Sequence, residues 1–298
     1  MSDELKEGCA VSEEAVACEP GVACESCAAR RELESACESA CAPAASAASA
    51  AAESSEPGSE EAGEVAAALE SRALFYETIA SLYFMPLKQE QVDSMAAADF
   101  SAYADLNEDF AAGVNDITRY LRKRNTGTRD ELAVDFTGAF AGVKVYEGKT
   151  AVPYKSVFTN KDGLMYQEGY QDVYRAFRSE CVKKREGLDW PDDHLSFMCE
   201  FMALLSRRAE AALAAGDPGR ALHELEVSRS FLDENILSWF DAFVERANLL
   251  VKTRFYKGVL KITRGFFALD RETLDDLVDV AAEQVAAQAK AQKQAAKA

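Results

Sequence analysis

Apolar residues recur every three or four positions from residue 64 to about residue 285, which is the period of an α-helix with one buried face. Leu69, Tyr76 and Tyr83 show this spacing at the start of the region. The four prolines beyond residue 63 fall where such patterns stop or start, and alternating runs of β-branched residues are missing. The pattern therefore predicts an all-α fold.

We expect a single globular domain of roughly nine to ten helices over residues 64–285. After a first helix over residues 65–85, the helical patterns cover roughly residues 102–123, 162–185, 192–215, 218–250, 253–267 and 271–284. Residues 286–298 are rich in Ala, Gln and Lys, so they can extend the last helix but have little to pack against. We expect this short tail to fray.

One long irregular connection is expected inside the domain, over residues 142–161. Its Tyr154 and Ser156 make it a candidate for function, since long loops in compact helical domains are uncommon and often functional. A loop that is anchored by its aromatic residues and merely fills a gap between helices is an equally open interpretation.

Residues 1–63 have a different composition. They contain no aromatic residue, and they carry 14 acidic against 3 basic side chains, a net charge of −11. Such a segment cannot bury enough apolar surface to offset the entropy lost on ordering. We expect it to be a disordered, acidic, Cys-rich tail.

Charge and hydropathy exclude several classes of function. The whole chain has a net charge of −18, which disfavours non-specific binding to nucleic acid. No run of 18 apolar residues occurs, so no membrane insertion is expected. The acidic N-terminus lacks the basic and apolar regions of a secretory signal, and a cytoplasmic protein is therefore expected.

Motifs for common enzymes are also missing. His194 and His223 are the two histidines of the sequence, and neither stands in a spaced metal-ligand set. There is no glycine-rich phosphate loop and no nucleophile elbow. A helical enzyme, for instance a nucleotide hydrolase that uses carboxylates, is a further alternative.

Six of the eight cysteines lie in the N-terminal tail. Cys24 and Cys27 can coordinate one metal ion in a tetrahedral site, and Cys37 and Cys41 can supply two further thiolate ligands. Acidic neighbours oppose thiolate formation, so reduced thiols without metal are the competing interpretation. Cys181 and Cys199 lie in helical patterns and are expected to be ordinary buried thiols.

The most distinctive cluster is Trp190-Pro191-Asp192-Asp193-His194, at the start of a helical pattern. In the simpler interpretation, Asp192 or Asp193 is the N-cap of a core helix and His194 is a buried, hydrogen-bonded ring. Alternatively, two carboxylates and an imidazole at a helix start bind a guanidinium or a peptide backbone in a groove.

With these residues the sequence resembles a known family. Residues 191–194 (PDDH) and 200–205 (EFMALL) are similar to two signature motifs of the TorD/DmsD-type, NarJ-like chaperones that mature redox enzymes. Residues 76–86 (YETIASLYFMP) and 153–158 (PYKSVF) resemble the first helix and the long loop of that family. The sequence departs from the family at Lys155, where an acidic residue is usual, and at Trp190, where Glu is frequent.

The resemblance implies a cytoplasmic, non-enzymatic chaperone without a cofactor of its own. Its partner would be the catalytic subunit of a molybdopterin-dependent oxidoreductase, bound through the twin-arginine signal peptide before cofactor insertion and export. The protein would be a monomer or a domain-exchanged dimer. The implied peptide-binding residues are Pro191, Asp192, Asp193, His194, Tyr154, Ser156 and Phe197. The alternative function is a metal or redox carrier that acts through the N-terminal cysteines.

Overall fold

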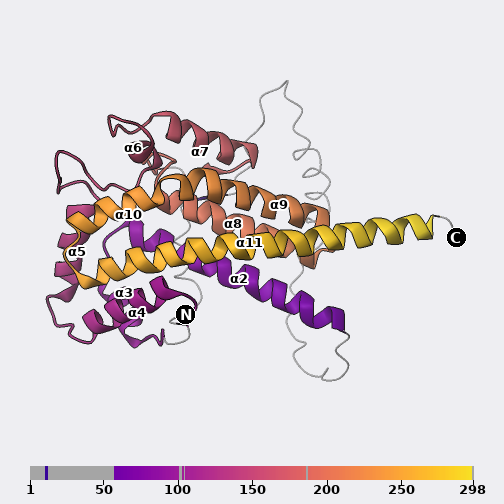
Figure 1. The fold of residues 1–298 in the computed structure, drawn as a ribbon, viewed down its shortest axis with the longest axis horizontal. Helices are drawn as coiled ribbons and strands as arrows, with labels where there is room; N and C mark the ends of the chain where they lie inside the picture. Colours follow the sequence, from indigo (N-terminus) through magenta and orange to yellow (C-terminus); the bar gives the residue numbers. More distant parts are fainter. Residues whose placement is uncertain (1–10, 13–56, 101–102, 104, 186, 297–298) are drawn as a thin grey trace.

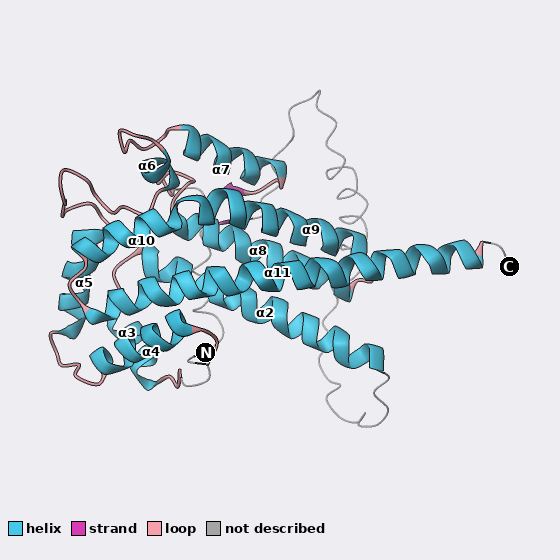
Figure 2. Ribbon diagram, viewed as in Figure 1, coloured by secondary structure: helices cyan, strands magenta, loops and turns pink. Residues whose placement is uncertain are grey.

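The computed structural model describes residues 11–12, 57–100, 103, 105–185 and 187–296. The described chain is almost wholly helical, which confirms the all-α prediction (Figures 1 and 2). The helices are α2 (Pro57–Phe84), α3 (Gln89–Ala97), α4 (Glu108–Leu121), α5 (Thr128–Ala139), α6 (Lys155–Thr159), α7 (Glu168–Ser179), α8 (Leu195–Ala214), α9 (Pro218–Phe231), the π-helix η3 (Leu232–Leu237), α10 (Ser238–Leu250) and α11 (Arg254–Ala295).

The core lies between five helices. Helix α8 packs against α2 and α9, and α11 packs against α4 and α9. Helix α8 is hydrophobic on nearly every side, as expected of a helix at the centre of a bundle, and residues 195–203 are all buried. Figure 1 shows α11 crossing the whole molecule and extending beyond it toward the C-terminus.

A buried ion pair joins three of these helices. The guanidinium of Arg72 on α2 contacts the carboxylate of Asp270 on α11 at 2.6 Å, and both side chains are almost fully buried. The Tyr76 hydroxyl donates to the same carboxylate at 2.6 Å, and Arg72 also donates to Ser206 on α8. Because every charge is paired, this network can sit inside the apolar core.

Helices α4 and α11 cross in close contact. An added Cβ on Gly113 would lie 2.8 Å from the carbonyl oxygen of Gly258, and the reciprocal contact to the carbonyl oxygen of Gly113 is also 2.8 Å. Any side chain larger than hydrogen would therefore force the two helices apart.

Several boundaries differ from the expectations. Helix α2 begins at Pro57, inside the segment expected to be a tail. The loop over residues 142–161 contains the short helix α6, and the two helices expected over residues 253–267 and 271–284 form one helix, α11. Residues 286–295 continue α11 with most of their side chains exposed.

One small sheet was not predicted. The strands β1 (Val11–Ser12) and β2 (Lys183–Lys184) pair antiparallel, with Val11 opposite Lys184. The rest of residues 1–56 lies outside the described residues, and so do the four cysteines predicted as metal ligands. No helix in the described part of the chain is both long and apolar enough to cross a membrane.

Candidate functional site

Two segments that are distant in sequence meet at the start of α8. The backbone N–H of Leu195 donates to the carbonyl of Pro153 at 2.8 Å, and the N–H of Lys155 donates to the carbonyl of Asp193 at 3.1 Å. These two bonds form an isolated antiparallel bridge between Tyr154 and His194. The structure thus brings the two predicted motifs together, and we call this contact the loop–helix junction.

The carboxylate of Asp193 lies inside the junction and is fully buried. Its Oδ2 accepts a hydrogen bond from the backbone N–H of Ser156 at 2.8 Å, in the first turn of α6. Burial raises the pKa of Asp193, and the hydrogen bond from Ser156 opposes this rise. Asp193 therefore caps α6, and the prediction that it or Asp192 caps the following helix is wrong.

His194 is the N-cap of α8. Its Nδ1 accepts a hydrogen bond from the backbone N–H of Ser196 at 3.1 Å. Burial lowers the pKa of His194 to about 3, so the ring is neutral at physiological pH. Aromatic rings surround it, with centroid distances of 4.9 Å to Tyr154, 5.2 Å to Trp190 and 5.8 Å to Phe197.

Asp192 lies at the edge of the junction. Its Oδ1 is 3.1 Å from the Nζ of Lys184, and its carboxylate interacts with the hydroxyl of Tyr170. Burial and this carboxylate together raise the pKa of Tyr170 to about 12. Lys184 donates as well to the carbonyl of Trp190, and its Nζ lies 5.3 Å from the centre of the Phe197 ring. The charge of Asp192 is thus balanced by one lysine that belongs to β2.

Lys155, which departs from the family pattern, is buried in the same region. Its Nζ donates to Asn235 Oδ1 of the π-helix at 2.9 Å and to Asp172 Oδ2 of α7 at 3.1 Å. The lysine therefore ties α6 to two neighbouring elements. An acidic residue at this position would face the carboxylate of Asp172 and lose both contacts.

Exposed apolar side chains stand close to the buried junction. Tyr154 and Trp190 are half-buried, and Leu164, Met165 and Tyr166 in the loop before α7 are 43–56% exposed. The Tyr166 ring lies 5.3 Å from that of Tyr170, which contacts Asp192. We call residues 164–166 with Tyr170 the apolar rim. A run of exposed apolar side chains next to a carboxylate is typical of a protein interaction site.

The other predicted residues are placed as follows. Pro191 and Phe197 are buried at the junction, where they support it. Cys199 is a buried free thiol, as expected, but Cys181 is half-buried in the turn after α7 with φ of 56°, so its predicted helical position is wrong. No group of metal-ligating side chains occurs among the residues that the structure describes.

Comparison with known proteins shows what the chain is similar to. The family described as "Nitrate reductase delta subunit" matches residues 104–245. A chaperone protein TorD from Vibrio vulnificus is 27% identical over 219 residues, which cover 71% of this chain and 98% of that relative. TorD proteins from Vibrio cholerae and a Psychrobacter species are 27% and 26% identical and cover 94% and 96% of their own lengths. The chain is therefore similar to the TorD-type maturation chaperones over most of its length.

The similarity to TorD-type chaperones supports a general role. The protein is a chaperone in the maturation of a molybdoenzyme, and it is not itself an enzyme. The sequence motifs at residues 153–158 and 191–194 were thus correct guides to the family. Sequence reasoning missed Lys184 and the apolar rim, although the basic run at residues 183–185 was a visible signal.

Proposed function

We propose that this TorD-type chaperone binds the twin-arginine signal peptide of a molybdoenzyme catalytic subunit in the cytoplasm, before cofactor insertion and export. The proposal rests on the contact between the almost fully buried carboxylate of Asp192 and Tyr170 of the apolar rim. A signal peptide combines arginines with an apolar stretch, and this part of the surface offers a partner for each.

The roles of the predicted residues follow from their burial. Asp193, Ser156 and His194 are fully or almost fully buried, so they hold the loop and the start of α8 in position. Tyr154 is half-buried, whereas Asp192 is buried with a side chain that keeps 9% exposure and pairs with Lys184, which is 19% exposed. A client guanidinium can replace the lysine ammonium, because arginine makes two parallel hydrogen bonds to a carboxylate where lysine acts as a point charge.

The apolar stretch of the peptide then lies on the apolar rim. Leu164, Met165 and Tyr166 lose water-exposed area on binding, which favours association by about 25 cal/mol for each Å² removed. No bond is made or broken in this function. The chaperone stabilises the unfinished client by binding it in preference to the folded product.

Titration calorimetry with a synthetic twin-arginine peptide tests the proposal. Asp192→Asn removes the charge and keeps the shape, so affinity should fall by about 1–3 kcal/mol, the contribution of a hydrogen bond to a charged group. The matched control is Asp189→Asn, which removes the same charge from an exposed neighbour and should change affinity little. Thermal melts must show that both variants are folded.

The peptide offers a second control. Replacement of its two arginines by lysines should weaken binding to the wild-type protein and have a smaller effect on Asp192→Asn. Equal affinity of the wild-type protein and Asp192→Asn for the arginine peptide would remove Asp192 from the binding site.

A further inference from the structure

A second surface, formed by other elements, combines an apolar groove with a cationic pocket. The groove has a volume of about 310 Å³ and runs between α2, α4 and α11. Leu74, Phe75, Tyr103 and Ile262 line it, and Leu74 is 50% and Tyr103 38% exposed. The sequence analysis did not identify this surface.

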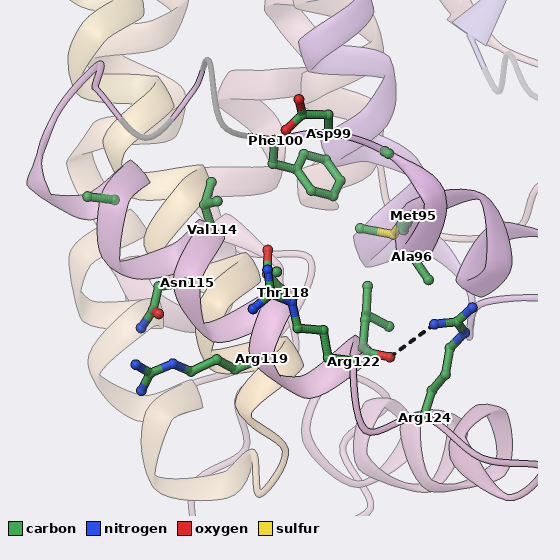
Figure 3. A pocket seen from close by; sticks show the side chains of 13 residues that line it. Met95, Ala96, Asp99, Phe100, Val114, Asn115, Thr118, Arg119, Arg122 and Arg124 are labelled. Atoms are coloured by element: carbon green, nitrogen blue, oxygen red, sulfur yellow. Dashed lines mark hydrogen bonds between the residues drawn. The ribbon is translucent and has the colours of Figure 1, made fainter.

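The pocket continues the groove toward the C-terminal end of α4. It has a volume of about 570 Å³ and shares Met95, Phe100 and Val114 with the groove. Figure 3 shows Arg119, Arg122 and Arg124 on the α4 side of this pocket, with Phe100 and Asp99 across from them.

The arginines carry charge that the described part of the chain does not neutralise. Neither Arg119 nor Arg122 forms an ion pair with a described residue. Arg124 has one long ion pair of 3.8 Å to Asp93, and it donates a hydrogen bond to the carbonyl of Leu121 at 3.3 Å. Their place at the end of α4 favours the helix dipole, yet a helix dipole balances only about half a charge. In a protein with a net charge of −18, this is a local excess of positive charge.

The dimensions of the surface indicate the size of its ligand. It follows α4 from Phe110 in the groove to Leu121 in the pocket. At 1.5 Å per residue this part of α4 is roughly 17 Å long. A peptide segment of about five extended residues, or three helical turns, spans that length, whereas a single small anion fills only the pocket.

We propose that the groove and pocket bind an amphipathic, acidic segment of a partner protein. Its apolar side chains lie in the groove against Leu74 and Tyr103, and its carboxylates pair with Arg122 and Arg124. Bidentate geometry makes arginine the suitable residue for such carboxylates. A basic signal peptide is repelled here, so this surface is separate from the site proposed at the loop–helix junction and does not depend on it.

Fluorescence anisotropy with two labelled probe peptides tests this assignment. Both are fourteen residues long, with Leu and Phe at helical spacing, and one ends in three Glu where the other ends in three Lys. The full-length protein should bind the Glu peptide at least about tenfold more tightly than the Lys peptide. The difference should shrink as salt is raised, because exposed charges are screened.

Charge reversal provides the decisive comparison. The double variant Arg122→Glu with Arg124→Glu should lose its affinity for the Glu peptide and bind the Lys peptide more tightly. The control double variant Lys290→Glu with Lys293→Glu changes the net charge equally on the exposed end of α11 and should keep the wild-type preference. Leu74→Gln should weaken the binding of both peptides, since it makes the groove less apolar and leaves the arginines in place.

Two results would overturn the proposal. One is an unchanged preference for the Glu peptide in the arginine double variant. The other is displacement of the Glu peptide by millimolar inorganic phosphate together with an unchanged affinity of Leu74→Gln, which would make the pocket a site for a small anion only.

Discussion

The carboxylate of Asp193 accepts a hydrogen bond from the backbone N–H of Ser156 at 2.8 Å, across 37 positions of sequence. This contact fixes the loop that contains α6 against the start of α8. Because the carboxylate is fully buried, both its acceptor function and its charge affect stability in ways that can be separated.

Asp193→Ala should lower the free energy of unfolding by about 1–3 kcal/mol, because the N–H of Ser156 would be left buried without a partner. Asp193→Asn should cost less than about 1 kcal/mol, since the amide oxygen can still accept the bond and asparagine caps helices as well as aspartate does. Urea denaturation of both variants measures the difference. Equal losses for Ala and Asn would mean that the charge, and not the hydrogen bond, is what the junction requires.

The neutral ring of His194 should make the protein sensitive to acid. The pKa of His194 is lowered to about 3 in the folded state, whereas an unfolded histidine titrates near 6.5. The contribution of the neutral ring to the free energy of unfolding is therefore fully present above about pH 6.5. It is lost as pH falls from about 6.5 toward 3, because the histidine of the unfolded state binds a proton first. The loss approaches about 1.4 kcal/mol per pH unit within this window.

Urea midpoints at pH 7.5 and 5.5 measure this effect. His194→Asn keeps an acceptor for the N–H of Ser196 but cannot titrate, so the variant should be less stable at pH 7.5 and show a smaller drop between the two values. Asp193 acts in the opposite sense, since its raised pKa favours the folded state as pH falls through its own window. An unchanged pH slope in His194→Asn would show that other groups cause the acid sensitivity.

The buried pair of Arg72 and Asp270 should show strong non-additivity. Arg72→Met leaves the Asp270 carboxylate buried without its guanidinium, which should cost about 3–5 kcal/mol. Arg72→Met combined with Asp270→Leu removes both charges and should cost less than the sum of the single changes. A double-mutant cycle from urea titrations gives the coupling energy, and additive losses would mean that the pair is not coupled.

Deletion of residues 1–56 should leave the melting temperature nearly unchanged. The described contacts that are lost are the two-residue pairing of β1 with β2 and the contact of β1 with α8, and α2 is kept from its first residue. A fall of more than a few degrees in a thermal melt would show that the segment contributes to folding of the helical domain.

The same pair of proteins tests the metal carrier hypothesis. If Cys24, Cys27, Cys37 and Cys41 bind a metal, the full-length protein purified without oxygen should contain stoichiometric zinc or iron, and the shortened protein should contain none. Elemental analysis measures both, and a metal-free full-length protein would exclude this alternative.

The sequence predicted the helical fold because prolines and three- to four-residue spacing mark most helices directly. It predicted two helices, over residues 253–267 and 271–284, where the structure has the single helix α11, and Asp270 lies in the gap between them. Asp270 is nevertheless buried, and its polarity is satisfied by Arg72 from another helix. A partner that lies 198 positions away leaves no trace in local periodicity.

The candidate site was predicted in composition but not in geometry. The family resemblance assigned residues 153–156 and 191–194 to one site. The sequence could not show, however, which residue near Asp192 and Asp193 would be the N-cap of α8. His194 is the N-cap of α8 because the chain turns so that the side chain of Asp193 faces α6. Which carboxylate is fully buried and which keeps a small exposed fraction depends on this turn, and only the fold determines it.

The close contact between Gly113 and Gly258 has a consequence for the apolar groove. Helices α4 and α11 form two of its walls, and their separation is determined by two residues without side chains. Gly113 and Gly258 therefore determine the width of the groove, although neither residue lines it. A single methyl group added at either glycine would change which side chains fit between the helices while every lining residue stayed the same.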